Sequence, residues 1–366
     1  MRLTARFSPG VPQLLDELAV SLMVTTYQAG KVILLSAAGE RLVQLLRDFD
    51  RPMGIATNGD LLALALRLNV SIFRNDRELA RTYPKNPDTY DAMYFPIAIN
   101  KTDFIDTHDL FFTNSGLVAV NTAYSCLVKV DGTFSFQPIW KPTFISDYRD
   151  ADYCHLNGMS VDADGEVSFV TAFGETSTPS GWRTNKLLGG VVIDVRSGET
   201  VCGELAMPHS PRIYRNKLYV LASGTEELLQ VDPKTGQKET VARLDGFIRG
   251  LSFAGDYAFV GSSKLRKSHA FGDLGIANKR IRAGVSVVNI VSGEVVGSIE
   301  YGDELDEVYD VHVLPEKQRP NILNLPMSEQ FRAMVTPHGA RWVLPEDPGP
   351  KSNSKIADEV RANESA

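Results

Sequence analysis

The chain has 366 residues, of which 43% are hydrophobic and 23% charged, proportions that are ordinary for a globular protein with a full core. Its formal net charge of -7 argues against nucleic acid as a partner, because binding a phosphate backbone needs a basic face. The cysteines, Cys126, Cys154 and Cys202, are too few for a disulfide framework and lack the CxxC spacing of a structural zinc site.

Neither an apolar leader nor a long apolar run stands out in the sequence. The first ten residues lack the apolar segment of a signal peptide. No stretch approaches the roughly 18 consecutive apolar residues of a membrane-spanning helix. We therefore expect a cytoplasmic protein that has no membrane partner.

The predicted elements begin with a short helix and continue as strands. Residues 12–20 predict the helix, because Leu14, Leu15 and Leu18 fall on one face. From residue 22 onward, short apolar or alternating runs are separated by Gly, Asp and Asn, a pattern typical of β-strands. Pairs such as Asn58-Gly59 favour tight hairpins, because these residues adopt positive φ at little cost. The sequence therefore predicts an all-β protein.

One strand pattern recurs six times along the chain. Its successive starts lie 55, 49, 53, 39 and 61 residues apart, against about 40–50 residues for each blade of a β-propeller. The longer gaps would hold insertions, such as 173–188 and 264–281. We predict a six-bladed β-propeller, with a seven-bladed ring as the alternative. The six starts are Met53, His108, Asn157, Ser210, Arg249 and Asp310.

The last predicted blade is built from both ends of the chain. After Asp310 only one clear strand precedes Pro315 and Pro320, and residues 22–27, 31–36 and 42–46 supply the missing three. Such closure removes the exposed sheet edges of an open ring. The predicted domains are a propeller over 1–320, a C-terminal extension packed on the body over 321–347, and a polar disordered tail over 348–366.

Polar side chains gather at the starts of the predicted inner strands. Because these strands line the central channel, their first residues should meet around one axis. Arginine there could hold a carboxylate or phosphate in a bidentate fork. His108, His155 and His209 could also bind a divalent transition metal through neutral nitrogens. The alternative is a set of buried, hydrogen-bonded residues that plug the channel. The predicted ligand-binding residues are His108, His155, Asn157, His209, Arg212, Arg249 and Asp310.

The insertion over residues 176–186 is a second candidate. It combines Trp182 with the cations Arg183 and Lys186, a mixture suited to gripping a polar ligand. The alternative is an exposed loop with one packed tryptophan. Cys154 beside His155 is not a nucleophile–base pair in our interpretation, since adjacent strand residues point to opposite faces. The GxSxG, GxGxxG and GxxxxGK[ST] signatures are absent.

Several motifs together resemble a bacterial family of conserved hypothetical proteins. The resemblance covers about residues 24–320 and implies a propeller-like domain of unknown function, found in some members beside tetratricopeptide repeats. It implies no catalytic residues, and His312 stands where the family pattern would have a small apolar residue. The motifs are Val120-Asn121-Thr122, Ser125-Cys126-Leu127, Cys154-His155-Leu156-Asn157-Gly158-Met159, Gly181-Trp182-Arg183, Asn185-Lys186, Gly189-Gly190, Met207-Pro208-His209-Ser210-Pro211-Arg212, Arg249-Gly250-Leu251, Val260-Gly261-Ser262-Ser263-Lys264, Tyr309-Asp310-Val311 and Leu314-Pro315.

The predicted function is binding of a small polar or anionic ligand at the mouth of the channel. An enzyme version would be a metal-assisted lyase, hydrolase or oxygenase, with His108, His155 and His209 as ligands and Arg249 or Arg212 holding the substrate. The alternative is a non-catalytic platform that binds a protein or peptide. The sequence does not decide whether the protein is an enzyme, or which cofactor it would use.

Overall fold

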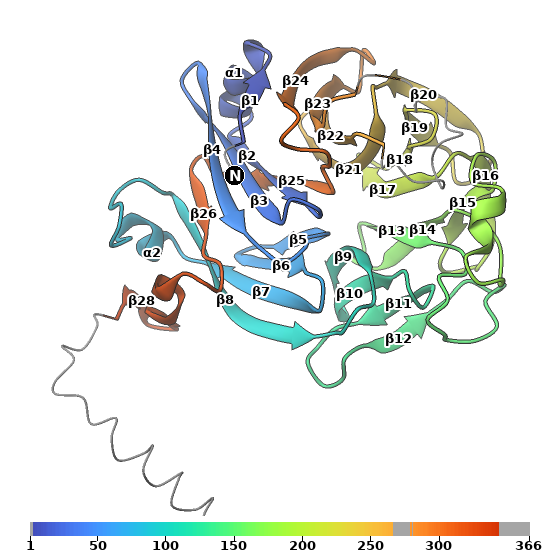
Figure 1. The fold of residues 1–366 in the computed structure, drawn as a ribbon, viewed down its shortest axis with the longest axis horizontal. Coiled ribbons are helices and arrows are strands. Elements are labelled where there is room, and N and C mark those ends of the chain that lie inside the picture. The colour runs from blue at the N-terminus through green and yellow to red at the C-terminus, as the bar shows by residue number, and fades with distance from the viewer. Residues whose placement is uncertain (1–2, 266–278, 280, 344–366) are drawn as a thin grey trace, which may run out of the picture.

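Six β-sheets form a ring around one axis in the computed structural model, which describes residues 3–265, 279 and 281–343 (Figure 1). Each sheet is one blade of four or five strands. We number the blades in chain order around the ring. Blade 1 contains the N-terminal strands, and blade 6 is the last blade whose four inner strands follow one another along the chain. This arrangement confirms the predicted six-bladed β-propeller and excludes the seven-bladed alternative.

The innermost strands of the blades surround the axis. Each contacts the inner strand of the next blade, and the last of them also contacts the first, so the ring is closed. All six start within two residues of the predicted positions. From blade 1 to blade 6 the inner strands are β25 (Asp310–Pro315), β5 (Ile55–Asn58), β9 (Thr107–Thr113), β13 (Leu156–Val161), β17 (Pro208–Tyr214) and β21 (Phe247–Ala254).

Blade 1 joins the two ends of the propeller, as predicted. Its inner strand β25 pairs antiparallel with β2 (Val20–Thr26) over six residue pairs, and β3 (Lys31–Ala38) and β4 (Arg41–Asp48) follow outward. Every residue of β2 is buried, because one face packs on blade 6 and the other on blade 2. Strand β2 therefore closes the ring.

The other blades follow one antiparallel pattern outward from the axis. Their second strands end in buried apolar runs that fill the space between blades. The outer strands are β6 (Leu61–Ala65), β7 (Asn69–Asn75), β8 (Ala92–Lys101), β10 (Gly116–Asn121), β11 (Cys126–Lys129), β12 (Gln137–Trp140), β14 (Val167–Ala172), β15 (Gly190–Asp194), β16 (Thr200–Leu205), β18 (Lys217–Ala222), β19 (Glu227–Val231), β20 (Lys238–Arg243), β22 (Tyr257–Ser263), β23 (Gly284–Asn289) and β24 (Val295–Tyr301).

Two blades carry a fifth strand that the sequence did not predict. Strand β1 (Ala5–Phe7) pairs with β24 of blade 6, and β26 (Pro320–Ile322) pairs in parallel with β8 of blade 2. Both cover outer edges that would otherwise expose unpaired backbone groups. The predicted N-terminal helix exists as α1 (Gly10–Glu17), which lies against β2, β3 and β24.

The C-terminal extension lies on blade 2. It contains a 3-10 turn (Ser328–Phe331) and the hairpin β27 (Ala333–Thr336) and β28 (Gly339–Trp342), placed beside α2 (Arg77–Arg81) (Figure 1). The Trp342 indole donates a hydrogen bond to the backbone oxygen of Leu79 at 3.0 Å. The predicted tail at 348–366 and most of the insertion at 264–281 lie outside the described residues. Among the described helices, none has the length and apolar character needed to cross a membrane.

Candidate functional site

Three histidines from three consecutive blades approach one another at the end of the propeller where the inner strands begin. The ring centroids of His108 and His155 lie 5.0 Å apart, in an edge-to-face contact. Phe173 lies 4.5 Å from His155 and 5.1 Å from His209, and Phe247 lies 5.4 Å from His209. The imidazoles therefore belong to one continuous set of aromatic contacts across blades 3 to 6.

Arg249 of blade 6 completes this arrangement. Its guanidinium carbon lies 3.6 Å from the ring centroid of Tyr309, and that ring lies 5.6 Å from His108. The Arg249 charge reaches both His108 and His209 electrostatically, and its Nη1 lies 3.7 Å from a carboxylate oxygen of Glu307. The structure thus brings together the three histidines and Arg249. We call His108, His155, His209, Arg249 and Tyr309 the axial cluster.

The tautomer of His108 follows from its partners. Its Nδ1 lies 3.0 Å from the Asp106 backbone oxygen and 2.8 Å from the Thr122 hydroxyl. That hydroxyl donates its own proton to the Leu156 backbone oxygen at 2.5 Å. Both neighbours of Nδ1 are therefore acceptors, so Nδ1 carries the hydrogen. In the neutral ring Nε2 is then a bare acceptor.

His209, two blades further on, is held by the same kind of hydrogen-bond partners. Its Nδ1 lies 3.1 Å from the Met207 backbone oxygen and 2.8 Å from the Ser223 hydroxyl. Ser223 donates to the Ile248 backbone oxygen at 2.5 Å. The same reasoning places the hydrogen on Nδ1 and leaves Nε2 as an acceptor.

His155 is oriented by a carboxylate instead. Its Nδ1 lies 3.1 Å from each oxygen of Asp152, which also accepts a 3.0 Å hydrogen bond from the Trp182 indole. The Nδ1 of His155 therefore carries a hydrogen and donates it to this carboxylate. Within the described part of the chain, none of the three Nε2 atoms has a hydrogen-bond partner.

Burial disfavours the charged forms of His108, His209 and Tyr309. It lowers the pKa of His108 to about 4, and burial together with Arg249 lowers the pKa of His209 well below its usual value. Burial also raises the pKa of Tyr309 far above its usual value. At neutral pH the cluster therefore presents neutral His108 and His209, a protonated phenol and one guanidinium cation.

Two polar atoms of the cluster are buried without a partner among the described residues. These are Nε of Arg249, whose residue is only 9% exposed, and the phenol oxygen of Tyr309. The Nη1 of Arg249 lies 3.7 Å from the Glu307 carboxylate, an ion-pair distance that is too long for a hydrogen bond. Buried polar groups almost always have partners, because an unpaired one costs about 1–3 kcal/mol or more if charged. Arg249 and Tyr309 are thus available to a ligand.

Three other predicted ligand residues are already satisfied deeper along the axis. Arg212 forms a bidentate ion pair with Asp109, at 2.7 and 3.2 Å. Both oxygens of Asp310 accept backbone N–H groups, and Asn157 accepts a 2.8 Å hydrogen bond from the Thr171 hydroxyl. The plug interpretation therefore describes these residues better than a ligand role. We do not place them in the proposed site.

The backbone explains why neighbouring inner-strand residues reach different depths. The pairing of β17 with β18 shifts between His209 and Arg212, and a similar shift occurs in β21 between Ile248 and Leu251. Such bulges re-aim side chains toward the axis. Gly250 occupies the second bulge with φ +78°, and a Cβ there would lie 2.6 Å from the Val311 backbone nitrogen. Only glycine fits this position.

Most of the insertion is exposed, but its tryptophan packs into the body. Trp182 is 3% exposed and belongs to an apolar cluster with Phe173 and Phe247. Arg183 is exposed and stacks on the Trp182 ring at 4.3 Å, whereas Lys186 is buried. This agrees with the alternative of a loop with one packed tryptophan, and Trp182 is a core residue.

The geometry gives no support to a metal held by the three histidines. Phe173 lies between His155 and His209 in the chain of ring contacts. Among the described residues, no three His, Cys, Asp or Glu side chains gather in a way that could hold a metal ion. The metal site stays a prediction, and we do not use it below.

Sequence reasoning missed several parts of the site. Phe173, Phe247 and Tyr309 form its aromatic walls, and Asp152 orients His155. Asp152 precedes His155 by three residues, and Tyr309 directly precedes Asp310, so both were detectable as neighbours of a strand start.

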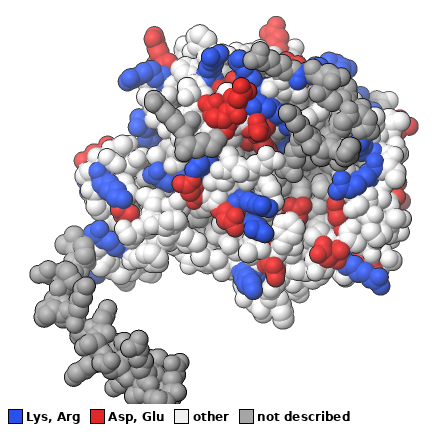
Figure 2. Space-filling view, in the orientation of Figure 1, with Lys and Arg blue, Asp and Glu red and all other residues white. Residues whose placement is uncertain are grey.

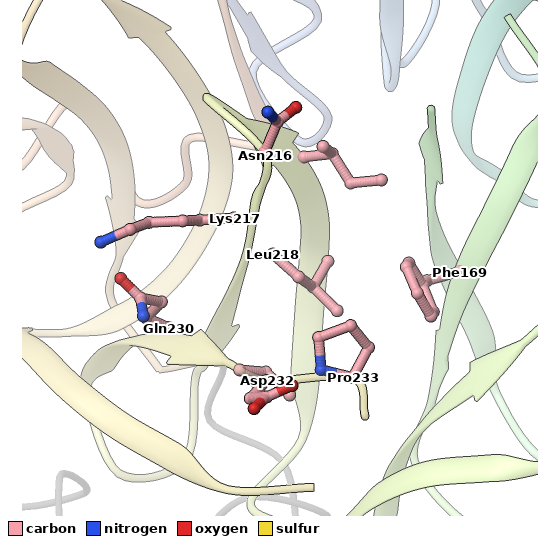
Figure 3. Close-up of a pocket in the computed structure, with 9 residues that line it drawn as sticks. Phe169, Asn216, Lys217, Leu218, Gln230, Asp232 and Pro233 are labelled. Atoms are coloured by element: carbon pink, nitrogen blue, oxygen red, sulfur yellow. The ribbon is translucent and has the colours of Figure 1, made fainter. Parts of the chain in front are cut away.

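A separate pocket of about 280 Å³ lies between blades 4 and 5 (Figure 3). Leu218 and Pro233 face Phe169 of the neighbouring blade across it. Asn216 belongs to the turn that follows the inner strand β17, so the pocket is at the end of the propeller opposite the axial cluster. It contains none of the predicted site residues.

The charged surface is mixed on the face seen in Figure 2. Lys and Arg side chains lie beside Asp and Glu side chains there. Exposed ion pairs also occur in the described part of the chain, such as Arg215 with Asp256 and Arg282 with Glu300. This pattern is typical of an ordinary solvated surface.

Acidification is expected to destabilise the fold through its buried histidines. Burial lowers the pKa of His312 and of His108 from 6.5 to about 4. Between about pH 6.5 and pH 4, these histidines are therefore protonated in the unfolded chain and neutral in the folded chain. Stability is thus full above pH 6.5 and falls toward pH 4, by about 3 kcal/mol for each histidine. Asp310 opposes this, because burial raises its pKa from 3.8 to about 7 and it favours folding as the pH falls.

Urea unfolding at pH 7 and pH 4.5 tests this expectation. Between these pH values, the free energy of unfolding of His312→Gln should fall by about 2–3 kcal/mol less than that of the unmodified protein. The variant lacks one of the histidines that take up a proton on unfolding. Glutamine can retain a hydrogen bond to the Thr57 hydroxyl, which lies 2.9 Å from His312 Nε2. Equal losses in both proteins would contradict the assignment.

Comparisons with known proteins agree with this fold. Residues 9–323 match the model of a family described as "Domain of unknown function (DUF4915)". No curated protein matches the sequence. Two solved structures share the fold: a chain from the crystal structure of a nidogen/laminin complex (TM-score 0.54, 10% identity, covering 81% of this chain and 99% of that one) and a protein of unknown function from Bacteroides caccae (TM-score 0.52, 8% identity, covering 81% and 98%).

Proposed function

The chain belongs to this family of unknown function, and we propose that its propeller binds a small polar ligand with an anionic group at the axial cluster. The observation that carries the proposal is Arg249, a buried cation whose Nε has no hydrogen-bond partner within the described residues and whose ion pair with Glu307 is long, at 3.7 Å. Folding that cation away from water is costly unless something else satisfies it. A ligand anion would do so.

A carboxylate or phosphate suits the guanidinium of Arg249. The planar fork of arginine matches these groups bidentately, and the hydrogen bonds are strengthened by charge. Glu307 lies 3.7 Å away and balances part of the Arg249 charge while it leaves the Nε–H free. The Tyr309 hydroxyl, buried and without a partner among the described residues, supplies a further donor beside the cation.

Calorimetric titration with inorganic phosphate, benzoate and D-glucuronate tests the proposal. At least one of these anions should bind with a Kd of about 1 mM or tighter. Arg249→Met should weaken that binding by about 10–100-fold, because it removes a charged hydrogen-bond donor. Arg249→Lys should give an intermediate affinity, since it keeps the charge and loses the fork.

Arg183→Met is the matched control. Arg183 is also a cation of this end of the propeller, but it is exposed and lies on the outside of Trp182. Its removal should leave anion affinity unchanged. The proposal is wrong if no anion of the panel binds, or if binding survives unchanged in Arg249→Met that unfolds cooperatively. A protein or peptide partner would then be the better interpretation.

A further inference from the structure

The imidazoles of His108 and His209 present acceptors, not donors, to whatever occupies the site. Each Nδ1 is used by an acceptor on the protein, which leaves Nε2 bare on these two histidines. A ligand that is purely anionic would bring only more acceptors to these nitrogens. A ligand that also carries O–H or N–H groups would donate hydrogen bonds to these nitrogens.

The charge around the imidazoles distinguishes hydroxyl groups from ammonium groups. His108 and His209 both sit in the positive field of Arg249, and both are too deeply buried to accept a proton near neutral pH. A ligand ammonium at Nε2 would meet the same burial and the same repulsion. A neutral hydroxyl donates a hydrogen bond there without either cost.

The walls of the site indicate a compact ring or chain. Phe173, Trp182 and Phe247 pack around His155 and His209, while Tyr309 lies between Arg249 and His108. Aromatic faces of this kind pack against the C–H surface of a carbon skeleton.

We propose that the ligand is a hydroxylated carboxylic acid of the sugar-acid type, with its carboxylate on Arg249 and hydroxyl groups donating to the imidazole Nε2 atoms. This inference rests on the proposed function and adds the recognition of the ligand's hydroxyl groups to that of its anionic group. Arg249 supplies affinity for the charge, and His108 and His209 select hydroxyl groups over bare or ammonium-bearing carboxylates.

Four probes of similar size separate these contributions. D-Glucuronate has a carboxylate and hydroxyl groups, cyclohexanecarboxylate has only the carboxylate, and methyl glucoside has only hydroxyl groups. Glutamate has an ammonium group and two carboxylates but no hydroxyl. D-Glucuronate should bind the unmodified protein at least about tenfold more tightly than each of the others, a difference of about 1.4 kcal/mol that one or two added hydrogen bonds can supply. This comparison needs no variant.

His209→Phe provides the matched change. Phenylalanine keeps an aromatic ring against Phe173 and Phe247 and removes both nitrogens, including Nδ1 with its contacts to Met207 and Ser223. It should weaken D-glucuronate by about tenfold and leave cyclohexanecarboxylate unaltered. His108→Phe is the second variant if the first does not fold, with the same expected result.

The outcomes separate this inference from the proposed function. If cyclohexanecarboxylate binds as tightly as D-glucuronate and both are lost in Arg249→Met, the anion site stands and hydroxyl selection is overturned. Tighter binding of glutamate overturns it in the same way. If none of the anions binds, both the site and its selectivity fall.

Discussion

Replacing Arg212 by Met is expected to lower the free energy of unfolding by about 3–5 kcal/mol, the usual cost of breaking a buried ion pair from one side. Arg212 is 14% and its partner Asp109 5% exposed in their side chains. The variant would leave the Asp109 charge buried beside an apolar side chain. Urea unfolding at pH 7 measures the loss.

Arg212 also ties four blades together. From blade 5 its guanidinium bonds Asp109 of blade 3, the Met159 backbone oxygen of blade 4 at 3.0 Å and the Leu251 backbone oxygen of blade 6 at 3.2 Å. One substitution would thus leave a carboxylate and two carbonyls without this donor. Each is a buried acceptor whose lost hydrogen bond costs free energy.

Arg215→Met is the control for this experiment. Arg215 lies in the turn after the same strand and pairs with Asp256 at 2.5 Å, but both side chains are half exposed. An exposed pair contributes about 0–1 kcal/mol. Combining Arg212→Met with Asp109→Leu should recover part of the stability, because no buried charge is then left unpaired. Equal losses for Arg212→Met and Arg215→Met would refute the role of the axial ion pair.

Deleting residues 1–48 is expected to abolish cooperative folding. The deletion removes β2, β3 and β4, so β25 loses its only partner in blade 1 and the ring opens. Leu22, Val24, Ile33 and Leu35 are all fully buried there. Each contributes about 1.5–3 kcal/mol, which together is comparable to the about 5–15 kcal/mol that stabilises a whole domain.

Solubility and urea unfolding measure the result. The truncated protein should aggregate, because opened sheets present unpaired strand edges. Deleting only residues 1–7 is the control, since it removes the outermost strand β1 and leaves blade 1 intact. That shorter protein should stay soluble and unfold in one transition. A soluble, cooperatively unfolding protein that lacks residues 1–48 would disprove the closure by β2.

The sequence alone determined the number of blades and how the ring closes. Strand period and turn chemistry are local, so pairs such as Asn58-Gly59 and the recurrent strand starts predicted six units and the blade shared by both termini. The fifth strands β1 and β26 escaped prediction. Each has three residues, and each depends on an edge supplied by a distant part of the chain.

Only the tertiary structure decided which polar residues are free. Arg212 and Arg249 look alike in the sequence, since each lies at the start of an inner strand. Folding places Asp109 against Arg212 from two blades away and leaves Arg249 beside Tyr309, with its Nε lacking a hydrogen-bond partner among the described residues. The pairing of a buried charge depends on side chains brought together across blades, which no local pattern encodes.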